Sequence, residues 1–120
     1  ETGSFSAVPT TIGQKVMLNN DRFEVEVDWT TATGSGKADA ILATDDSAAF
    51  FFFDTANVDT LVRVFDGCSI NNRYWVFAGG LTDVAYTLTV TDTNTGTVRT
   101  FNAPGQAPAI NDTEAFETCP

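Results

Sequence analysis

Hydrophobic and polar side chains alternate along several short stretches of the chain, most regularly between Arg22 and Thr30. The apolar residues at positions 23, 25, 27 and 29 are separated there by acidic residues at positions 24, 26 and 28. Successive side chains of a β-strand point to opposite faces of the sheet, so a period of two predicts a strand with one dry and one solvated face. A helix would scatter these apolar residues over several faces.

The rest of the chain continues the same pattern. It predicts further strands over residues 14–18, 38–44, 49–53, 60–65, 73–78, 84–92 and 97–102, and residues 109–118 fit either a last strand or a short helix. Turn-forming residues stand between them, as at 19–21, 45–47 and 92–96. The stretch Thr31–Lys37 is expected to be an exposed loop, and Gly79-Gly80 to end the strand before it.

Short strands with turn signals every 8–12 residues or so indicate two stacked sheets. We expect an all-β fold, an immunoglobulin-like β-sandwich of seven to eight antiparallel strands, built around the hairpin in residues 65–80. A jelly roll or a small barrel is the alternative. Residues 14–120 are expected to form one domain. Residues 1–13 read as a processing remnant, Glu1-Thr2-Gly3, followed by a lead-in.

Four consecutive phenylalanines, residues 50–53, break the alternation. Such a run predicts one of two arrangements. Either both faces of this strand are covered, or one pair of rings is exposed for a partner.

The net charge of −10 narrows the range of partners. An acidic surface repels phosphate backbones, so we expect no nucleic-acid binding, and anionic membranes are disfavoured for the same reason. The sequence has no run of about 18 apolar residues, and we therefore expect no membrane insertion.

Cys68 and Cys119 are the two cysteines. In an acidic, threonine-rich and lysine-poor β domain they favour one disulfide and a secreted or cell-surface location. The alternative is two unrelated thiols in a cytoplasmic protein.

Four segments together resemble a family. They are residues 18–25 (LNNDRFEV), 65–68 (FDGC) with 72–77 (NRYWVF), 80–84 (GLTDV) and 90–96 (VTDTNTG). The family is a recurrent accessory β-sandwich domain of secreted bacterial proteins, found fused to extracellular proteases, other hydrolases and surface proteins. The resemblance implies an extracellular accessory module without catalysis. In that family a cysteine often stands where Met17 is here, which leaves Cys68 and Cys119 as the intrachain pair.

The chain has no histidine, and this removes Ser–His and Cys–His nucleophilic schemes and the usual zinc ligands. No carboxylate pair is singled out by its spacing, so we expect no enzyme activity and no required cofactor. Calcium is a further hypothesis, because Asp45, Asp46, Asp54 and Asp59 stand at turns around the phenylalanine run. Turn aspartates usually serve the turn itself.

The aromatic side chains are the remaining candidates for a site. Most of them are expected in the core, but Trp29, Phe51, Phe53, Tyr74 and Trp75 could form a platform for a protein partner or a glycan. We therefore expect a non-catalytic extracellular binding or assembly module. The alternatives are a structural subunit of an extracellular fibre or surface layer, oligomerising by strand exchange or edge pairing, and a carbohydrate-active enzyme.

Overall fold

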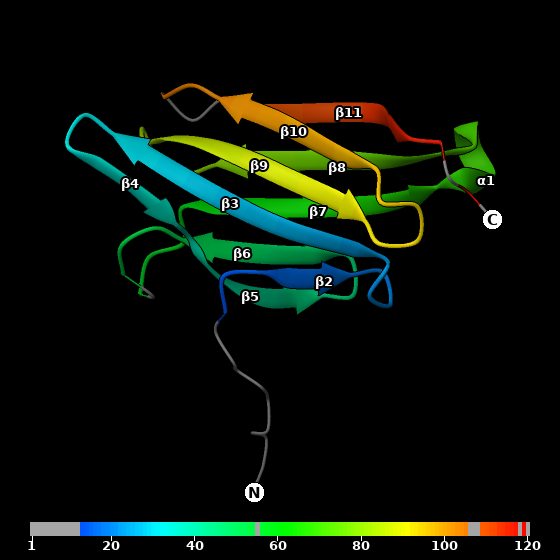
Figure 1. Cartoon of the computed structure of the whole chain (residues 1–120), viewed down its shortest axis with the longest axis horizontal. Coiled ribbons are helices and arrows are strands. Elements are labelled where there is room, and N and C mark those ends of the chain that lie inside the picture. The colour runs from blue at the N-terminus through cyan, green and yellow to red at the C-terminus, as the bar shows by residue number, and fades with distance from the viewer. Residues whose placement is uncertain (1–12, 55, 106–108, 118, 120) are drawn as a thin grey trace, which may run out of the picture.

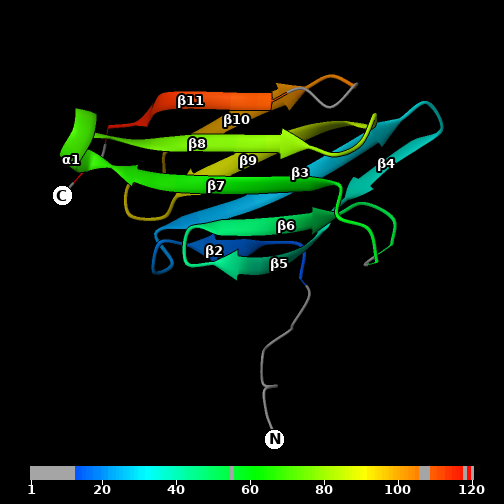
Figure 2. The same ribbon diagram turned by 180° about the vertical axis from the view of Figure 1, so that it is seen from behind.

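Two antiparallel five-stranded sheets lie face to face in the computed structural model, which describes residues 13–54, 56–105, 109–117 and 119 (Figure 1). The first sheet has the order β10 (Val98–Ala103), β9 (Ala85–Asp92), β3 (Phe23–Thr31) and β2 (Val16–Leu18), and β4 (Gly34–Lys37) pairs with the far half of β3. The second has the order β11 (Ala109–Phe116), β8 (Arg73–Gly80), β7 (Thr60–Gly67), β6 (Ser47–Phe51) and β5 (Asp39–Thr44), and Figure 2 shows it in front. The expected all-β sandwich is confirmed.

The core lies between the two sheets and follows the predicted alternation. Odd positions of β3 and even positions of β7, β8 and β9 face inward, and the intervening side chains face solvent. The largest fully buried side chains come from both layers: Phe23, Phe50, Phe116, Leu18, Leu88, Val25, Val27, Val62, Val64, Val76, Val90 and Thr60. Burying apolar side chains of this size stabilises by about 1.5–3 kcal/mol each relative to exposure.

The segment Thr31–Lys37 was wrongly expected to be a loop. Residues 34–37 form β4, which pairs with β3 from Asp28 opposite Lys37 to Thr31 opposite Gly34. The hydrogen bonds between β3 and β4 are made by backbone groups, which glycine and serine have like any other residue. The strand therefore forms without an apolar pattern from which it could be predicted. Trp29 lies against Gly36, where an added Cβ would come within 2.8 Å of the indole ring.

Three other boundaries differ from the prediction. Strand β8 continues through Gly79 and Gly80 instead of ending there, because both glycines pair with β7. Residues 109–116 form a strand, not a helix. The described residues hold two sheets of five strands, more than the seven to eight strands expected. The expectation for residues 1–12 lies outside the described residues, and Gly13 makes a bridge to Ala40 of β5.

One of the two arrangements foreseen for the phenylalanine run is found, because β6 is buried on both of its faces. Phe50 points into the core, and Phe51 is also buried but is not part of the central cluster. The strand ends at Phe51, so Phe52 can turn back into the core while Phe53 remains 62% exposed. Two covered faces thus accommodate Phe50 and Phe51, and the end of the strand accommodates Phe52 and Phe53.

Both long edges of the sandwich are joined by contacts between the sheets. On one side the amide of Asn19 donates to the carbonyl of Asp45 at 2.7 Å. On the other, Nε of Arg99 in β10 donates to the carbonyl of Ala115 in β11 at 2.9 Å. The first contact joins two turns, and the second satisfies one carbonyl at the edge strand β11.

One ion pair is buried at the turn end of the first sheet. The carboxylate of Asp92 is fully buried and accepts from Nε and Nη2 of Arg22, at 2.8 and 3.1 Å. The guanidinium also lies over the rings of Phe23 and Tyr74. A buried carboxylate needs such a partner, and removal of either member leaves the other charge without its compensation.

The expected disulfide between Cys68 and Cys119 is confirmed. Cys68 begins the one-turn helix α1 (Cys68–Asn71) that links β7 to β8, and the bond ties this link to the C-terminal residues across 51 positions of sequence. The Cα atoms of the two cysteines are 5.7 Å apart. The bond therefore fastens the end of the chain that follows β11.

Replacement of both cysteines by serine tests the contribution of this bond. Because the disulfide closes a loop of 51 residues, we expect the free energy of unfolding to fall by about 4 kcal/mol. Denaturant titration of the wild type and the double variant measures the difference. A fall below about 1 kcal/mol would mean that the tail is held by other contacts.

The two tyrosines give a test of burial by alkaline titration. Tyr74 and Tyr86 are both buried, and desolvation raises the pKa of each hydroxyl above its usual value near 10. The stability that the neutral hydroxyls contribute is present below about pH 10 and is lost as the pH rises through their folded pKa values. We expect tyrosinate absorbance to appear together with loss of β-sheet circular dichroism. A one-tyrosine step near pH 10 in the folded protein would contradict this.

Candidate functional site

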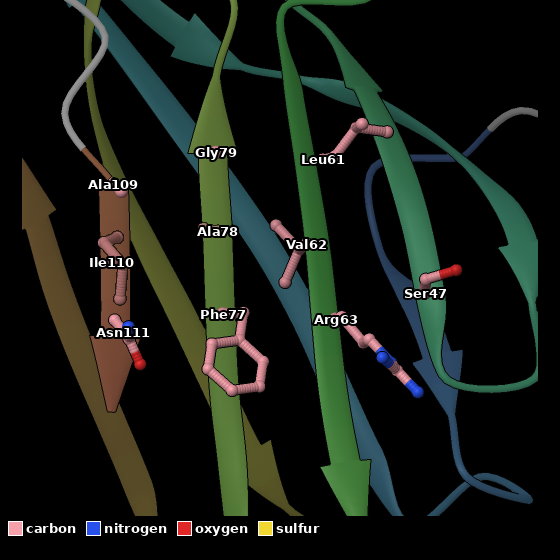
Figure 3. A pocket seen from close by; sticks show the side chains of 10 residues that line it. All are labelled: Ser47, Leu61, Val62, Arg63, Phe77, Ala78, Gly79, Ala109, Ile110 and Asn111. Atoms are coloured by element: carbon pink, nitrogen blue, oxygen red, sulfur yellow. The ribbon is translucent and has the colours of Figure 1, made fainter. Parts of the chain in front are cut away.

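The exposed side of the second sheet, called the outer face below, carries apolar side chains where solvated strands usually carry polar ones. The residues between the inward-facing valines of β7 and β8 point to this side (Figure 3). Its members are Leu61, Arg63 and Phe65 of β7, Trp75, Phe77 and Gly79 of β8, and Ala109 and Asn111 of β11. Cross-strand pairing sets Leu61 opposite Gly79, Arg63 opposite Phe77 and Phe65 opposite Trp75.

Three of these side chains form an aromatic row. The ring of Trp75 lies 5.2 Å from that of Phe65 and 6.0 Å from that of Phe77. The interplanar angles are 50° and 86°, so the rings meet at their edges and do not form one flat surface. The guanidinium of Arg63 lies over Phe65 at 4.7 Å and continues the row with a cation–π contact.

A groove of about 490 Å³ opens at the end of this row. Figure 3 shows it across β6, β7, β8 and β11, with Phe77 on one side and Leu61 on another. The residues that line it are Ser47, Leu61, Val62, Arg63, Phe77, Ala78, Gly79, Ala109, Ile110 and Asn111. Leu61 is 48% exposed, and the space above Gly79 is open, because an added Cβ there would meet no atom within 4 Å.

Acidic residues outnumber basic ones on the second sheet as a whole, while the groove is lined by no acid. The strands and loops of this sheet carry the acids Asp39, Asp45, Asp46, Asp54, Asp59, Asp66, Asp112, Glu114 and Glu117. Their cations are Arg63, which pairs with Asp46 at 3.0 Å, and Arg73, which lies 3.9 Å from Glu117. The groove is therefore mainly apolar and holds one charged side chain, Arg63, in a chain that is acidic as a whole.

Helix α1 fixes the orientation of Trp75. The indole Nε1 donates to Oδ1 of Asn71 at 2.7 Å, and Nδ2 of Asn71 donates to the carbonyl of Thr113 in β11 at 2.8 Å. Gly67 lies directly under the same indole, where an added Cβ would be well inside van der Waals contact. The disulfide, α1 and β11 thus hold one end of the aromatic row.

The other sheet presents a different surface. Its exposed side carries Glu24, Glu26 and Asp28 on β3, next to a threonine column on β9. Lys37 bridges two of these acids, with Nζ at 2.9 Å from Glu26 and 3.0 Å from Asp28. This side is charged and hydrated, so the two exposed sides of the sandwich differ sharply in character.

The five aromatic residues expected to form one platform are found in three places. Trp75 belongs to the aromatic row, and Phe51 is buried on the outer-face side of β6. Tyr74 points into the core, where its ring is 4.8 Å from that of Phe23. Trp29 and Phe53 contact each other at 4.9 Å at one end of the sandwich. The structure therefore does not bring these five together.

Three of the four aspartates of the calcium hypothesis, Asp46, Asp54 and Asp59, make local side-chain contacts. Asp46 binds Arg63 and Thr44, and Asp54 accepts the amide of Ala56. Asp59 accepts the amide of Phe52 at 2.8 Å, and Asp45 lies exposed in the β5–β6 turn. Within the described part of the chain, no three acidic or cysteine side chains are grouped as metal ligands.

Sequence reasoning overlooked Leu61, Phe65, Phe77 and Gly79. The signal was present, because β7 and β8 have apolar side chains at both odd and even positions. In a sheet with one wet face, the odd positions should be polar. The sequence did not show which of these apolar residues would be neighbours, because that depends on the register between β7 and β8.

Comparison with protein-family models, with curated proteins and with solved structures found no match. Among the described residues, no helix has the length and apolar character needed to cross a membrane.

Replacement of Gly67 by alanine tests the support under the aromatic row. The new methyl would collide with the indole of Trp75 and with the carbonyl of Arg73, so we expect a loss of about 1–3 kcal/mol in unfolding free energy and a shifted tryptophan emission. Gly34→Ala is the matched control, because nothing lies within 4 Å of its added Cβ. Equal stability of the two variants would show that Trp75 is not held in this position.

Proposed function

We propose that this chain is a non-catalytic accessory domain of a secreted or cell-surface protein, and that it binds a protein partner through the outer face. The observation that carries the proposal is the half-buried row of Phe65, Trp75 and Phe77 beside a groove that is bordered by the exposed Leu61, on a sheet whose solvated side should be polar. Contiguous apolar patches on an otherwise charged protein are typical of interaction sites.

The proposal includes an immunoglobulin-like topology for the sandwich, and several features support this topology and the extracellular location. The disulfide favours an oxidising compartment. The chain passes repeatedly between two antiparallel sheets, from β4 to β5, from β8 to β9 and from β10 to β11, as chains of immunoglobulin-like sandwiches do. The resemblance to accessory domains of secreted bacterial proteins agrees with both and remains part of the proposal.

A protein fits the outer face better than a glycan does. Sugar rings stack on flat aromatic surfaces, whereas neighbouring rings in this row are inclined by 50° and 86°. Few polar side chains border the groove to meet sugar hydroxyls, since Leu61, Phe77, Gly79 and Ala109 make up most of its exposed lining. Shape and chemistry both favour the apolar side chains of a protein.

The fibre alternative is less well supported. A fibre that grows by strand exchange needs a terminal strand that can leave its own sheet. Strand β11 is joined to β8, bonded to β10 through Arg99, and followed by the disulfide to α1. To release this strand, its pairing with β8, the hydrogen bond from Arg99 and the disulfide would all have to break.

A random peptide library displayed on phage tests the proposal. The two lysines of the chain, Lys15 and Lys37, both belong to the first sheet or its approach, so coupling through amines leaves the outer face free. We expect peptides to be enriched whose affinity falls at least about tenfold on Leu61→Glu, because the substitution places a charge in an apolar contact.

Two further variants complete this test. Phe77→Thr keeps a strand-forming residue and should also weaken binding, whereas Thr100→Glu adds the same charge to exposed β10 and should not. Circular dichroism checks that each variant is folded. Enriched peptides that bind Leu61→Glu as well as the wild type would contradict the proposal, and so would glycan-array binding that this substitution abolishes.

A further inference from the structure

Resting on the proposed function, we infer that the outer face recognises a basic segment of its partner by taking one large apolar side chain into the groove above Gly79. The occupant is thus a polypeptide in which an aromatic or long aliphatic residue is flanked by lysine or arginine. Two features lead to this class of partner: the shape of the groove and the net charge of the chain.

The shape of the groove comes from the register of three strands. Gly79 of β8 stands between Leu61 of β7 and Ala109 of β11. The residue without a side chain therefore lies between the long side chain of Leu61 and the short side chain of Ala109. Phe77, two positions earlier on β8, lies on the same side. Figure 3 shows Gly79 between these two neighbours, with the ring of Phe77 further along the same strand.

The hollow above Gly79 is open and apolar. Among the described residues, no atom lies within 4 Å of a Cβ added at Gly79, and the backbone there is not in the left-handed region that favours glycine. The fold therefore has no local need for glycine at this position. A single inserted side chain would contact Leu61 and Phe77 and exclude water from both, as buried anchors do at protein interfaces.

The charge of the whole chain selects the residues beside the anchor. The groove is lined by one charged side chain, Arg63, which pairs with Asp46, and the chain as a whole carries a net charge of −10. A second copy of this chain would bring its own net charge of −10 to the contact. Complementarity therefore favours a basic partner over self-association.

Blocked pentapeptides of the form Lys-Arg-X-Arg-Lys test the inference by titration against isotope-labelled protein. The reporters are the indole signal of Trp75 and the amide signals of Leu61 and Phe77. We expect X as Trp or Leu to bind at least about tenfold more tightly than X as Ala, because only the large side chains bury apolar surface in the hollow. The analogues Glu-Glu-X-Glu-Glu should bind much more weakly, and added salt should weaken the basic peptides.

Gly79→Leu is the decisive variant, because it fills the hollow from within. It should reduce the affinity for the Trp peptide at least about tenfold. Gly34→Leu is the control, since the space around Gly34 is equally open and lies on β4 of the other sheet. Unchanged binding by Gly79→Leu would overturn the inference.

The outcomes separate this inference from the proposed function. If X as Ala binds the outer face as tightly as X as Trp, the anchor is wrong and the protein-binding function stands. If acidic and basic peptides bind equally, the basic class of partner is wrong. If neither library peptides nor pentapeptides shift the outer-face signals, both the inference and the proposed function fail.

Discussion

The register between β7 and β8 is the constraint on which both the core and the outer face depend. Val62 and Val64 lie inward beside Ala78 and Val76, so Leu61 and Phe65 must lie outward beside Gly79 and Trp75. A slip of one residue in either strand would exchange these two sets. The same hydrogen bonds that bury the valines therefore bring the aromatic row together, and the site needs no separate framework of its own.

The ends of the sandwich hold this register in place. Helix α1 joins β7 to β8 in one turn, and the disulfide from Cys68 ties it to the segment after β11. Asn71 in that turn binds both the indole of Trp75 and the backbone of Thr113. The disulfide thus stabilises the fold and also supports one end of the aromatic row, which links its loss to the outer face as well as to global stability.

The two exposed sides of the sandwich differ in the polarity of their side chains. The first sheet presents acids and threonines, and these keep the chain hydrated. The second presents aromatic and aliphatic side chains, in a chain whose net charge of −10 repels further copies of itself. In the proposed function, a partner would cover this apolar surface.

By itself the sequence determined the fold class, the disulfide and most strands. Alternation is a local property that each strand carries in its own residues, and the pair of cysteines could be read from composition. The strand β4 was missed because its glycines and serine have no pattern, and its pairing with β3 is made by the backbone.

Only the tertiary structure decided which aromatic side chains share a surface. Trp75 and Tyr74 are neighbours in sequence yet face solvent and core respectively, while Leu61 and Gly79 are brought together by pairing across β7 and β8. Parity assigns each residue to one face of its strand, but contact between strands depends on register and on which sheet covers which face. Those depend on the whole chain packing at once, and no single segment encodes them.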